Sequence, residues 1–254
     1  MDLSNLQLAI VVGLVFLAGF VDSIAGGGGL ISLPAYFAVG LPPHAALATN
    51  KFSSFCGTFT AVLRYFNAGK IRLKIGLIAA LGALAGSAAG AKAALFVHAS
   101  VIRTVMLVLA PTVLVFFIVH KKILPPSDGK GGVAHETVKA CLIGAVVGLY
   151  DGFFGPGTGT FLTIGFHFLL RFDLVTASAN ARLSNLASNA GALAVFLVNA
   201  QVVFPLALYA AAGGIAGNLI GSSLAIQRGE RIVRPLLIVV LVLLLAEVVR
   251  QQIG

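Results

Sequence analysis

The stretch GFVDSIAGGGGLISLP, residues 19–34, places an aspartate and four consecutive glycines inside an otherwise apolar N-terminal segment. Each glycine in a helix interior costs about 1 kcal/mol relative to alanine. A carboxylate at the centre of a bilayer costs about 2.5–3.5 kcal/mol even on the most lenient scale. Both penalties at one place indicate a break in a helix that serves a function.

The composition predicts the medium in which this break lies. Of 254 residues, 59% are hydrophobic and only 10% are charged, and the mean hydropathy is +1.03. Soluble domains average about 45–50% apolar and about 25% charged residues, so the chain is predicted to be an integral membrane protein. The net charge of +9 comes from short basic runs between apolar segments, as in the loops of membrane proteins. It does not indicate nucleic-acid binding.

Apolar segments follow one another along the chain, and their number depends on how the breaks are counted. There are eight apolar segments if 6–25 and 29–40 are counted together as one broken unit, 6–40, as 140–170 is. The predicted segments are 6–25, 29–40, 46–66, 75–97, 101–119, 140–170 (itself broken near 155), 183–199, 203–226 and 236–249.

The second break, GLYDGFFGPGTGTFLT at residues 148–163, repeats the first. Asp151 matches Asp22 at an offset of 129 (151 − 22). Further along the offset is 131, and Arg182 matches Lys51 (182 − 51). The chain is therefore predicted to be a duplication, with a first repeat at 1–121, a polar cytoplasmic linker at 122–136 and a second repeat at 137–254.

Glycine stripes recur in the two repeats as well. The runs at 82–90 and 213–221 carry a glycine at every fourth residue, again at an offset of 131 (213 − 82). Small residues at this spacing let helices approach closely in membranes. We interpret both runs as packing faces.

The loop charges predict the orientation of the repeats. The loop at 64–74, the linker and the loop at 228–234 all carry lysines or arginines and are predicted to be cytoplasmic. The connections at 98–100 and 199–203 carry neither residue and are predicted to be external.

These assignments agree only if 140–170 enters and leaves on the cytoplasmic side and 6–40 on the external side. The repeats are then inverted copies in an all-α fold, each a broken helix or hairpin plus three transmembrane helices. One alternative stays open, because 6–25 as a helix is about 30 Å long and could itself span the bilayer. The two copies would then run parallel, and a binding site at the breaks would lie at another depth in the membrane.

Glycine-rich breaks at corresponding positions of inverted halves indicate the central binding site of a transporter. Beyond each break a half-helix begins, whose free N–H groups and positive dipole end favour an anion. We therefore expect the two glycine tips to face each other near the midplane as an anion cradle. The tips supply the candidate substrate-binding residues Gly26, Gly27, Gly28, Gly29, Gly155, Gly157 and Thr158.

Polar residues follow each break, in ATNKFSSF at 48–55 and ANARLSNLASN at 179–189. The two cations there either bind an oxyanion, or neutralise the aspartates, or extend to the membrane interface. The uncharged residues either contact the substrate or hydrogen-bond between helices. The candidates for substrate binding are Thr49, Asn50, Lys51, Ser54, Asn180, Arg182 and Asn185, and Ser53, Ser184 and Asn189 add hydrogen-bonding groups.

Asp22 and Asp151 either carry coupling protons, because desolvation raises a carboxyl pKa, or cap and pair within the protein. Capping or pairing is favoured, and we expect both carboxylates to sit behind the glycine loops, since an anion site disfavours a bare carboxylate. The five histidines share no ligand spacing, so no metal site or cofactor is predicted.

The paired motifs resemble those of the sulfite exporter TauE/SafE family of membrane transporters, and of its YfcA-like members most. The resemblance covers nearly the whole chain and includes Asp22, Lys51, Asp151, Pro156 and Arg182. It implies a multi-pass carrier of small anions in the bacterial inner membrane, with sulfite or an organosulfonate as substrate. The second copy has proline and threonine in place of two glycines, so an asymmetric cradle is expected.

Together these features predict a secondary transporter that moves a small oxyanion by alternating access, with a proton or a sodium ion as the coupling ion. A passive anion channel is the alternative, because the same dipoles can line a pore. An enzyme is disfavoured, since no nucleophile–base set is found. The transport direction and the oligomeric state, a homodimer included, stay open.

Overall fold

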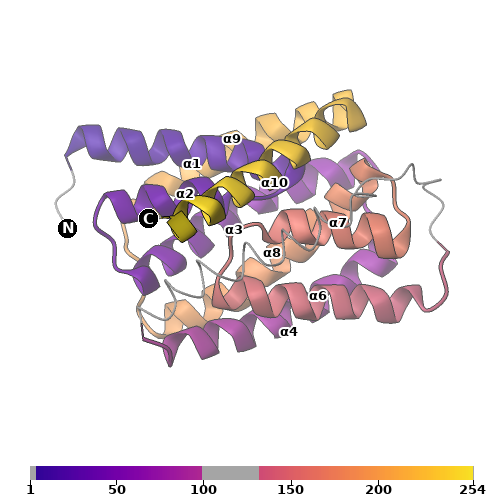
Figure 1. The fold of residues 1–254 in the computed structure, drawn as a ribbon, viewed down its shortest axis with the longest axis horizontal. Helices are drawn as coiled ribbons and strands as arrows, with labels where there is room; N and C mark the ends of the chain where they lie inside the picture. Colours follow the sequence, from indigo (N-terminus) through magenta and orange to yellow (C-terminus); the bar gives the residue numbers. More distant parts are fainter. Residues whose placement is uncertain (1–3, 99–131, 254) are drawn as a thin grey trace.

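The chain is all-helical throughout the part that the structure describes. The structure is a computed structural model; it describes residues 4–98 and 132–253, and no strand occurs in these two ranges. The helices are α1 (Asn5–Ala25), α2 (Gly29–Ala38), α3 (Pro43–Asn67), α4 (Leu73–Leu95), α6 (Glu136–Phe153), α7 (Thr158–Leu170), α8 (Leu174–Val198), α9 (Leu206–Arg228) and α10 (Glu230–Ile253) (Figure 1). The predicted segment at 101–119 and most of the predicted linker at 122–136 lie outside the described residues.

Both helix breaks occur where the sequence predicts them. α1 ends before Gly26 and α2 begins at Gly29, whereas α6 ends at Phe153 and α7 begins at Thr158. Four glycines in these loops have positive φ values: 89° and 87° at Gly26 and Gly27, and 103° and 81° at Gly155 and Gly157. Glycine adopts such values without the steric cost that a side chain brings.

α8 begins earlier than the predicted apolar segment at 183–199. The carboxylate of Asp173 accepts hydrogen bonds from the backbone N–H groups of Val175 and Thr176, which caps the helix at Leu174. The polar run at 179–189 is therefore helix interior, and most of it is buried. The predicted start is too late because the polar residues before 183 were not counted as part of an apolar segment. Their side chains face other helices and not water.

Within the described ranges, four helices, α1, α4, α8 and α9, are long and apolar enough to cross a membrane. On α4, Leu77, Leu81 and Leu84 are exposed at a spacing that places them on one face. An exposed apolar face of this kind is suited to lipid chains. Transmembrane helices are thus confirmed in length and composition.

The glycine stripes are packing faces, as predicted. A Cβ atom on Gly82 of α4 would lie 2.6 Å from the carbonyl oxygen of Cys141 on α6, and one on Gly213 of α9 would lie 2.6 Å from that of Val12 on α1. Real Cβ atoms essentially never come this close to backbone. The stripes therefore let α4 lie against α6, and α9 against α1, at backbone contact.

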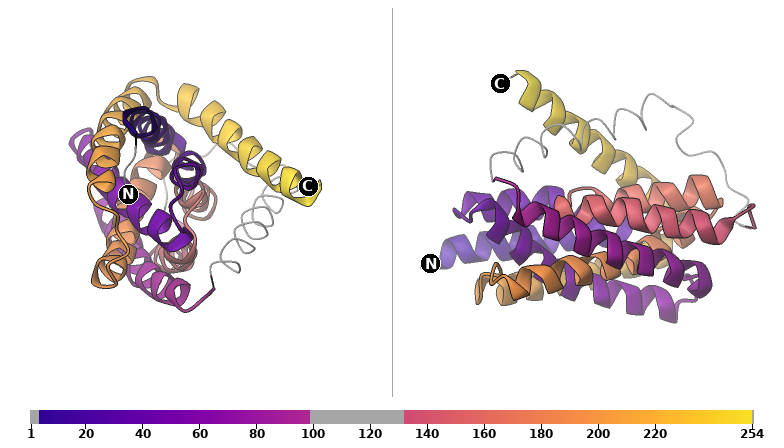
Figure 2. Two further views of the ribbon diagram at one scale, coloured as in Figure 1. Left: turned by 90° about the vertical axis from the view of Figure 1, so that its left-hand side faces the viewer. Right: turned by 90° about the horizontal axis from the view of Figure 1, so that it is seen from below.

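The helices form two similar close pairs, with a third pair between them. α1 packs on α9 and α4 packs on α6, while α3 and α8 contact each other between these pairs. In Figure 1, α1 starts at the left end of the bundle and α6 at the right end, and both end near its middle. Figure 2 shows α10, in yellow, projecting away from the bundle.

Candidate functional site

The two glycine loops lie against each other. The Thr160 hydroxyl donates to the carbonyl oxygen of Ala25 (3.0 Å), and the Ser178 hydroxyl donates to that of Ile24 (2.7 Å). A Cβ atom on Gly26 would overlap the backbone of Gly159 and Thr160. The tips therefore face each other as predicted, and the absence of a side chain at residue 26 is what lets them meet.

Two ion pairs at this junction join the first half of the chain to the second. Lys51 Nζ lies 2.6 Å from Asp151 Oδ1, and Arg182 Nη1 lies 3.2 Å from Asp22 Oδ2. Each cation thus pairs with an aspartate from the other half of the chain. Of the alternatives that the sequence leaves open, the conformation described here shows neutralisation of the aspartates.

Asp151 is held by short contacts on both carboxylate oxygens. Thr158 Oγ1 donates to Oδ1 (2.7 Å), Ser188 Oγ donates to Oδ2 (2.5 Å), and Lys51 adds its ion pair. The Asp151 side chain is only 3% exposed. The ion pair and the two hydrogen bonds offset the desolvation penalty of this buried carboxylate.

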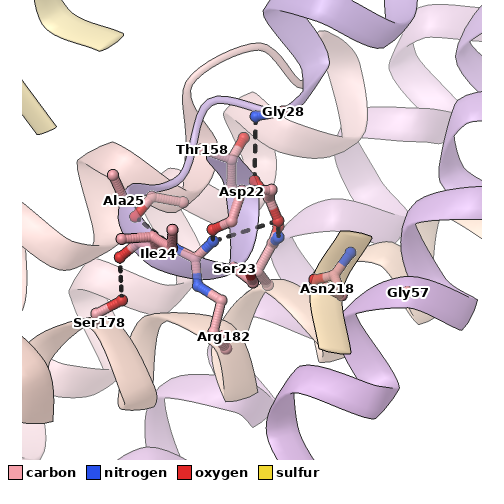
Figure 3. Close-up of polar contacts among 12 residues, drawn as sticks. Asp22, Ser23, Ile24, Ala25, Gly28, Gly57, Thr158, Ser178, Arg182 and Asn218 are labelled. Atoms are coloured by element: carbon pink, nitrogen blue, oxygen red, sulfur yellow. Dashed lines mark hydrogen bonds and ion pairs between the residues drawn. The ribbon is translucent and has the colours of Figure 1, made fainter. Parts of the chain in front are cut away.

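Asp22 is held more loosely. Its carboxylate accepts from the Gly28 N–H (3.2 Å) and from Asn185 Nδ2 (3.4 Å), and the side chain is 15% exposed. Arg182, which is fully buried, also donates to the backbone carbonyls of Asp22 and Gly159. Figure 3 shows the guanidinium between the end of α1 and the loop that precedes α7. Arg182 therefore joins the last turn of α1 to the first turn of α7.

A polar cavity lies between the loops. It has space for a water-sized molecule and for little more in this conformation. Its walls combine loop backbone with side chains of α3 and α8: Asp22, Gly27, Gly28, Gly29, Asn50, Lys51, Ser54, Asp151, Gly155, Gly157, Thr158, Gly159, Asn185 and Asn189.

Four of the candidate binding residues do not line this cavity. Gly26 packs against the second loop, and Arg182 lies behind that loop. Thr49 accepts a hydrogen bond from the Val203 N–H (3.2 Å), and Asn180 donates to the carbonyl of Thr176 (2.8 Å). These four contacts serve the protein scaffold.

One expectation is wrong. The sequence predicts Asp22 and Asp151 behind the glycine loops, but both line the cavity, because each carboxylate binds groups of its own loop. Asn189, which the sequence suggests as a hydrogen-bonding group, lines the cavity as well. Gly159 also lines it and is not predicted from the sequence; its place as the second glycine of the GTG run was the available signal.

Three amide side chains give the cavity donors for an oxyanion. Asn189 Nδ2 is buried without a hydrogen-bond partner among the described residues. The Asn50 side-chain oxygen accepts from Ser32 (2.6 Å), which leaves its amide N–H groups as the free end. Asn185 is held only by its long contact with Asp22. Together with Lys51 and the N-termini of α2 and α7, these groups suit an anion with several oxygens.

The comparisons with known proteins agree with this geometry. The family Sulfite exporter TauE/SafE matches residues 11–248. A probable membrane transporter protein, ORF9, from Sinorhizobium sp. is 36% identical over 239 residues, which is 94% of this chain and 91% of that protein. The probable membrane transporter YfcA of Escherichia coli K12 is 33% identical over 237 residues, 93% of this chain and 87% of that protein.

A probable membrane transporter from Haemophilus influenzae is 31% identical over 252 residues, covering 99% of this chain and 98% of that protein. No solved structure matches the chain. Fold and site together define a helical membrane transporter with paired helix breaks. The chain belongs to the sulfite exporter TauE/SafE family.

Proposed function

We propose that this protein is a secondary transporter that carries a small oxyanion, sulfite or an organosulfonate, by alternating access between two inverted halves. One observation carries the proposal. The two glycine loops, from corresponding places in the repeats, meet around a polar cavity that contains Lys51 and the N-termini of two half-helices. Irregular backbone inside a membrane protein is tolerated where it lines such a cavity.

Lys51 is the cation best placed to bind the substrate. It lines the cavity, whereas Arg182 lies behind the loop. An oxyanion that enters would share Lys51 with Asp151, which keeps its hydrogen bonds from Thr158 and Ser188. The carboxylate therefore does not become unpaired when the lysine turns to the substrate.

The size of the cavity supports a carrier in preference to an open channel. A water-sized space cannot hold sulfite, so the loops must separate before the substrate enters. The packing of α1 with α9 and of α4 with α6 gives two similar helix pairs, each with one helix from either repeat, and in this proposal one pair moves against the other. The helices α1 and α6, which carry Asp22 and Asp151, run in opposite directions in Figure 1, and this supports the inverted arrangement.

The substrate class rests on the site and on the family. The description of the family names sulfite, and a trigonal or tetrahedral oxyanion can use the amide donors and Lys51 at once. The bacterial relatives are named membrane transporters, so we place this protein in the inner membrane. It has no catalytic role in this proposal.

The test is uptake of radiolabelled sulfite into proteoliposomes containing the full chain. The double variant Lys51→Met/Asp151→Asn removes both charges together and leaves no lone buried charge. Loss of a charge-assisted contact of about 1.5–3 kcal/mol lowers the uptake rate at least about tenfold. The control is Lys92→Met, because Lys92 is exposed on α4.

The expected uptake by the unaltered protein saturates with sulfite and is stimulated by sulfite on the opposite side. Wild-type uptake by the double variant would overturn the role of Lys51. Large single-channel currents without saturation would establish the channel alternative. No flux of sulfite or of any tested sulfonate would overturn the substrate class.

A further inference from the structure

A second cavity lies beside the first, between α1, α3 and α9. Asp22 belongs to the walls of both, as do Gly28, Asn50 and Ser54. The second cavity extends to Thr58 on α3 and to Asn218 on α9. Like the first, it has space for a water-sized particle.

Two oxygen atoms in this second cavity are unusual. Thr58 Oγ1 and Asn218 Oδ1 are buried and have no hydrogen-bond partner among the described residues. The Asn218 amide nitrogen is already used, since it donates to the Gly214 carbonyl (2.9 Å). A buried acceptor without a partner costs about 1–3 kcal/mol, and such groups in native structures point to an ion or a water that satisfies them.

The fold makes room for Asn218 specifically. A Cβ atom on Gly19 of α1 or on Gly57 of α3 would lie 2.7 or 2.5 Å from Asn218 Nδ2. Figure 3 shows Asn218 reaching toward the helix that carries Gly57, on the same side of Arg182 as Asp22. Two glycines therefore accommodate an amide whose oxygen the protein itself does not use.

The other repeat has no such arrangement. The positions equivalent to Gly57 and Asn218 are Ser188 (57 + 131) and Ser87 (218 − 131). The Ser87 hydroxyl donates to the Ser188 carbonyl (2.6 Å), and the Ser188 hydroxyl donates to Asp151. At the Asp151 end the position equivalent to Thr58 is Asn189 (58 + 131), whose unpaired atom is the donor Nδ2. The pair of unpaired oxygens, Thr58 Oγ1 and Asn218 Oδ1, therefore distinguishes the Asp22 end.

The charge balance indicates what the second cavity binds. Lys51, Arg182, Asp22 and Asp151 sum to zero, so an oxyanion in the first cavity brings a charge that these four residues do not compensate. Carboxylate, amide and hydroxyl oxygens are ligands of hard cations. With one carboxylate, which Arg182 already neutralises, the oxygens suit a monovalent ion better than a divalent one.

We propose that the second cavity binds a sodium ion, with Asp22, Thr58 and Asn218 as ligands, and that this ion moves together with the oxyanion. The coupling part of the inference rests on the proposed function, whereas binding of sodium does not. Because Asp22 separates the two cavities, each ion strengthens the binding of the other.

The test of binding uses the purified full-length protein without any oxyanion. Its thermal unfolding midpoint is measured in sodium chloride against choline chloride at equal ionic strength. A site that exists only in the folded protein gives a rise in the midpoint that continues with sodium concentration, and potassium gives a smaller rise. No sodium-specific rise in the unaltered protein would overturn the inference.

Variants locate the site. Thr58→Val removes the unpaired oxygen and is expected to weaken sodium binding at least about tenfold, a loss that even outer-shell partners of metal sites cause. Thr58→Ser keeps the oxygen and is expected to keep the response. The matched control is Thr60→Val, because the Thr60 hydroxyl donates to the Gly57 carbonyl and lies outside the cavity. A wild-type sodium response in Thr58→Val would contradict the assignment.

Flux measurements separate this inference from the proposed function. Oxyanion uptake that is equal in sodium and choline, or that only a proton gradient drives, overturns sodium coupling and leaves the oxyanion carrier standing. Sodium-specific stabilisation without any oxyanion flux supports the cation site and overturns the proposed function. Uptake that depends on sodium, and loses this dependence in Thr58→Val, supports both.

Discussion

Asp22 and Asp151 occupy equivalent positions in two copies of one motif, yet their surroundings differ. Asp151 has contacts of 2.5–2.7 Å and a side chain that is 3% exposed. Asp22 has contacts of 3.2–3.4 Å and a side chain that is 15% exposed, and it borders two cavities. The two carboxylates thus differ: Asp151 is held closely by its neighbours, and Asp22 is held loosely beside two cavities.

Two sequence differences account for this asymmetry. Ser188 supplies a hydroxyl to Asp151, whereas Gly57 at the equivalent place supplies none to Asp22. Lys51 gives Asp151 a compact charge, but the planar guanidinium of Arg182 divides its donors between the Asp22 carboxylate and two carbonyls. The surroundings of Asp151, the tighter end, are therefore expected to matter more for stability. The surroundings of Asp22, the looser end, are expected to matter more for ion binding.

The largest expected effect follows from breaking the tighter ion pair. Lys51→Ala leaves Asp151 buried beside an empty position, and we expect a loss of about 3–5 kcal/mol in the free energy of unfolding. The measurement is denaturant unfolding of the purified protein in detergent micelles. The double variant Lys51→Met/Asp151→Asn is the control and is expected to recover most of the loss, so equal losses in both would contradict the account.

A smaller effect is expected from removing one hydrogen bond at the same end. Ser188→Ala deletes the donor that lies 2.5 Å from Asp151. A hydrogen bond to a charged group contributes about 1.5–3 kcal/mol, and the same unfolding measurement detects such a change. Ser188→Thr keeps the hydroxyl and serves as the control. An unchanged free energy of unfolding in Ser188→Ala would show that Asp151 is not fixed in the way described.

The smallest effect is expected at the looser end. Asn185→Ala removes the 3.4 Å contact with the Asp22 carboxylate. Because this contact is long, we expect a loss of only about 0.5–1.5 kcal/mol, below the range of a short hydrogen bond to a charged group. A loss larger than that of Ser188→Ala would reverse the comparison between the two carboxylates. The pair of variants therefore tests the asymmetry directly.

Much of the architecture could be predicted from sequence. Hydropathy located most of the helices, the glycine runs marked both breaks, and the stripes at 82–90 and 213–221 identified the faces that pack at backbone contact. The matching motifs at 19–34 and 148–163 also named most of the residues that line the first cavity. These features depend on local pattern and on symmetry.

The details that break the symmetry were harder to predict. Which cation pairs with which aspartate depends on the distance between helices, and the sequence alone does not set that distance. Arg182 shares a position with Lys51 in the repeat, but its longer side chain reaches carbonyls behind the loop. The place of Asn218 depends on the space left by Gly19 and Gly57, which lie on two other helices.

The most direct measurement of the central claim is cross-linking between the two loops in intact membranes. A Cβ atom on Gly29 would lie 3.3 Å from Pro156 Cα. After Cys56 and Cys141 are replaced by serine, the pair Gly29→Cys and Pro156→Cys is expected to form a disulfide, since this separation is within disulfide reach. Gly29→Cys paired with Leu81→Cys, on the exposed face of α4, is the control. A disulfide in the first pair alone is the predicted result; no cross-link, with the two cysteines labelled from opposite membrane surfaces, would contradict it.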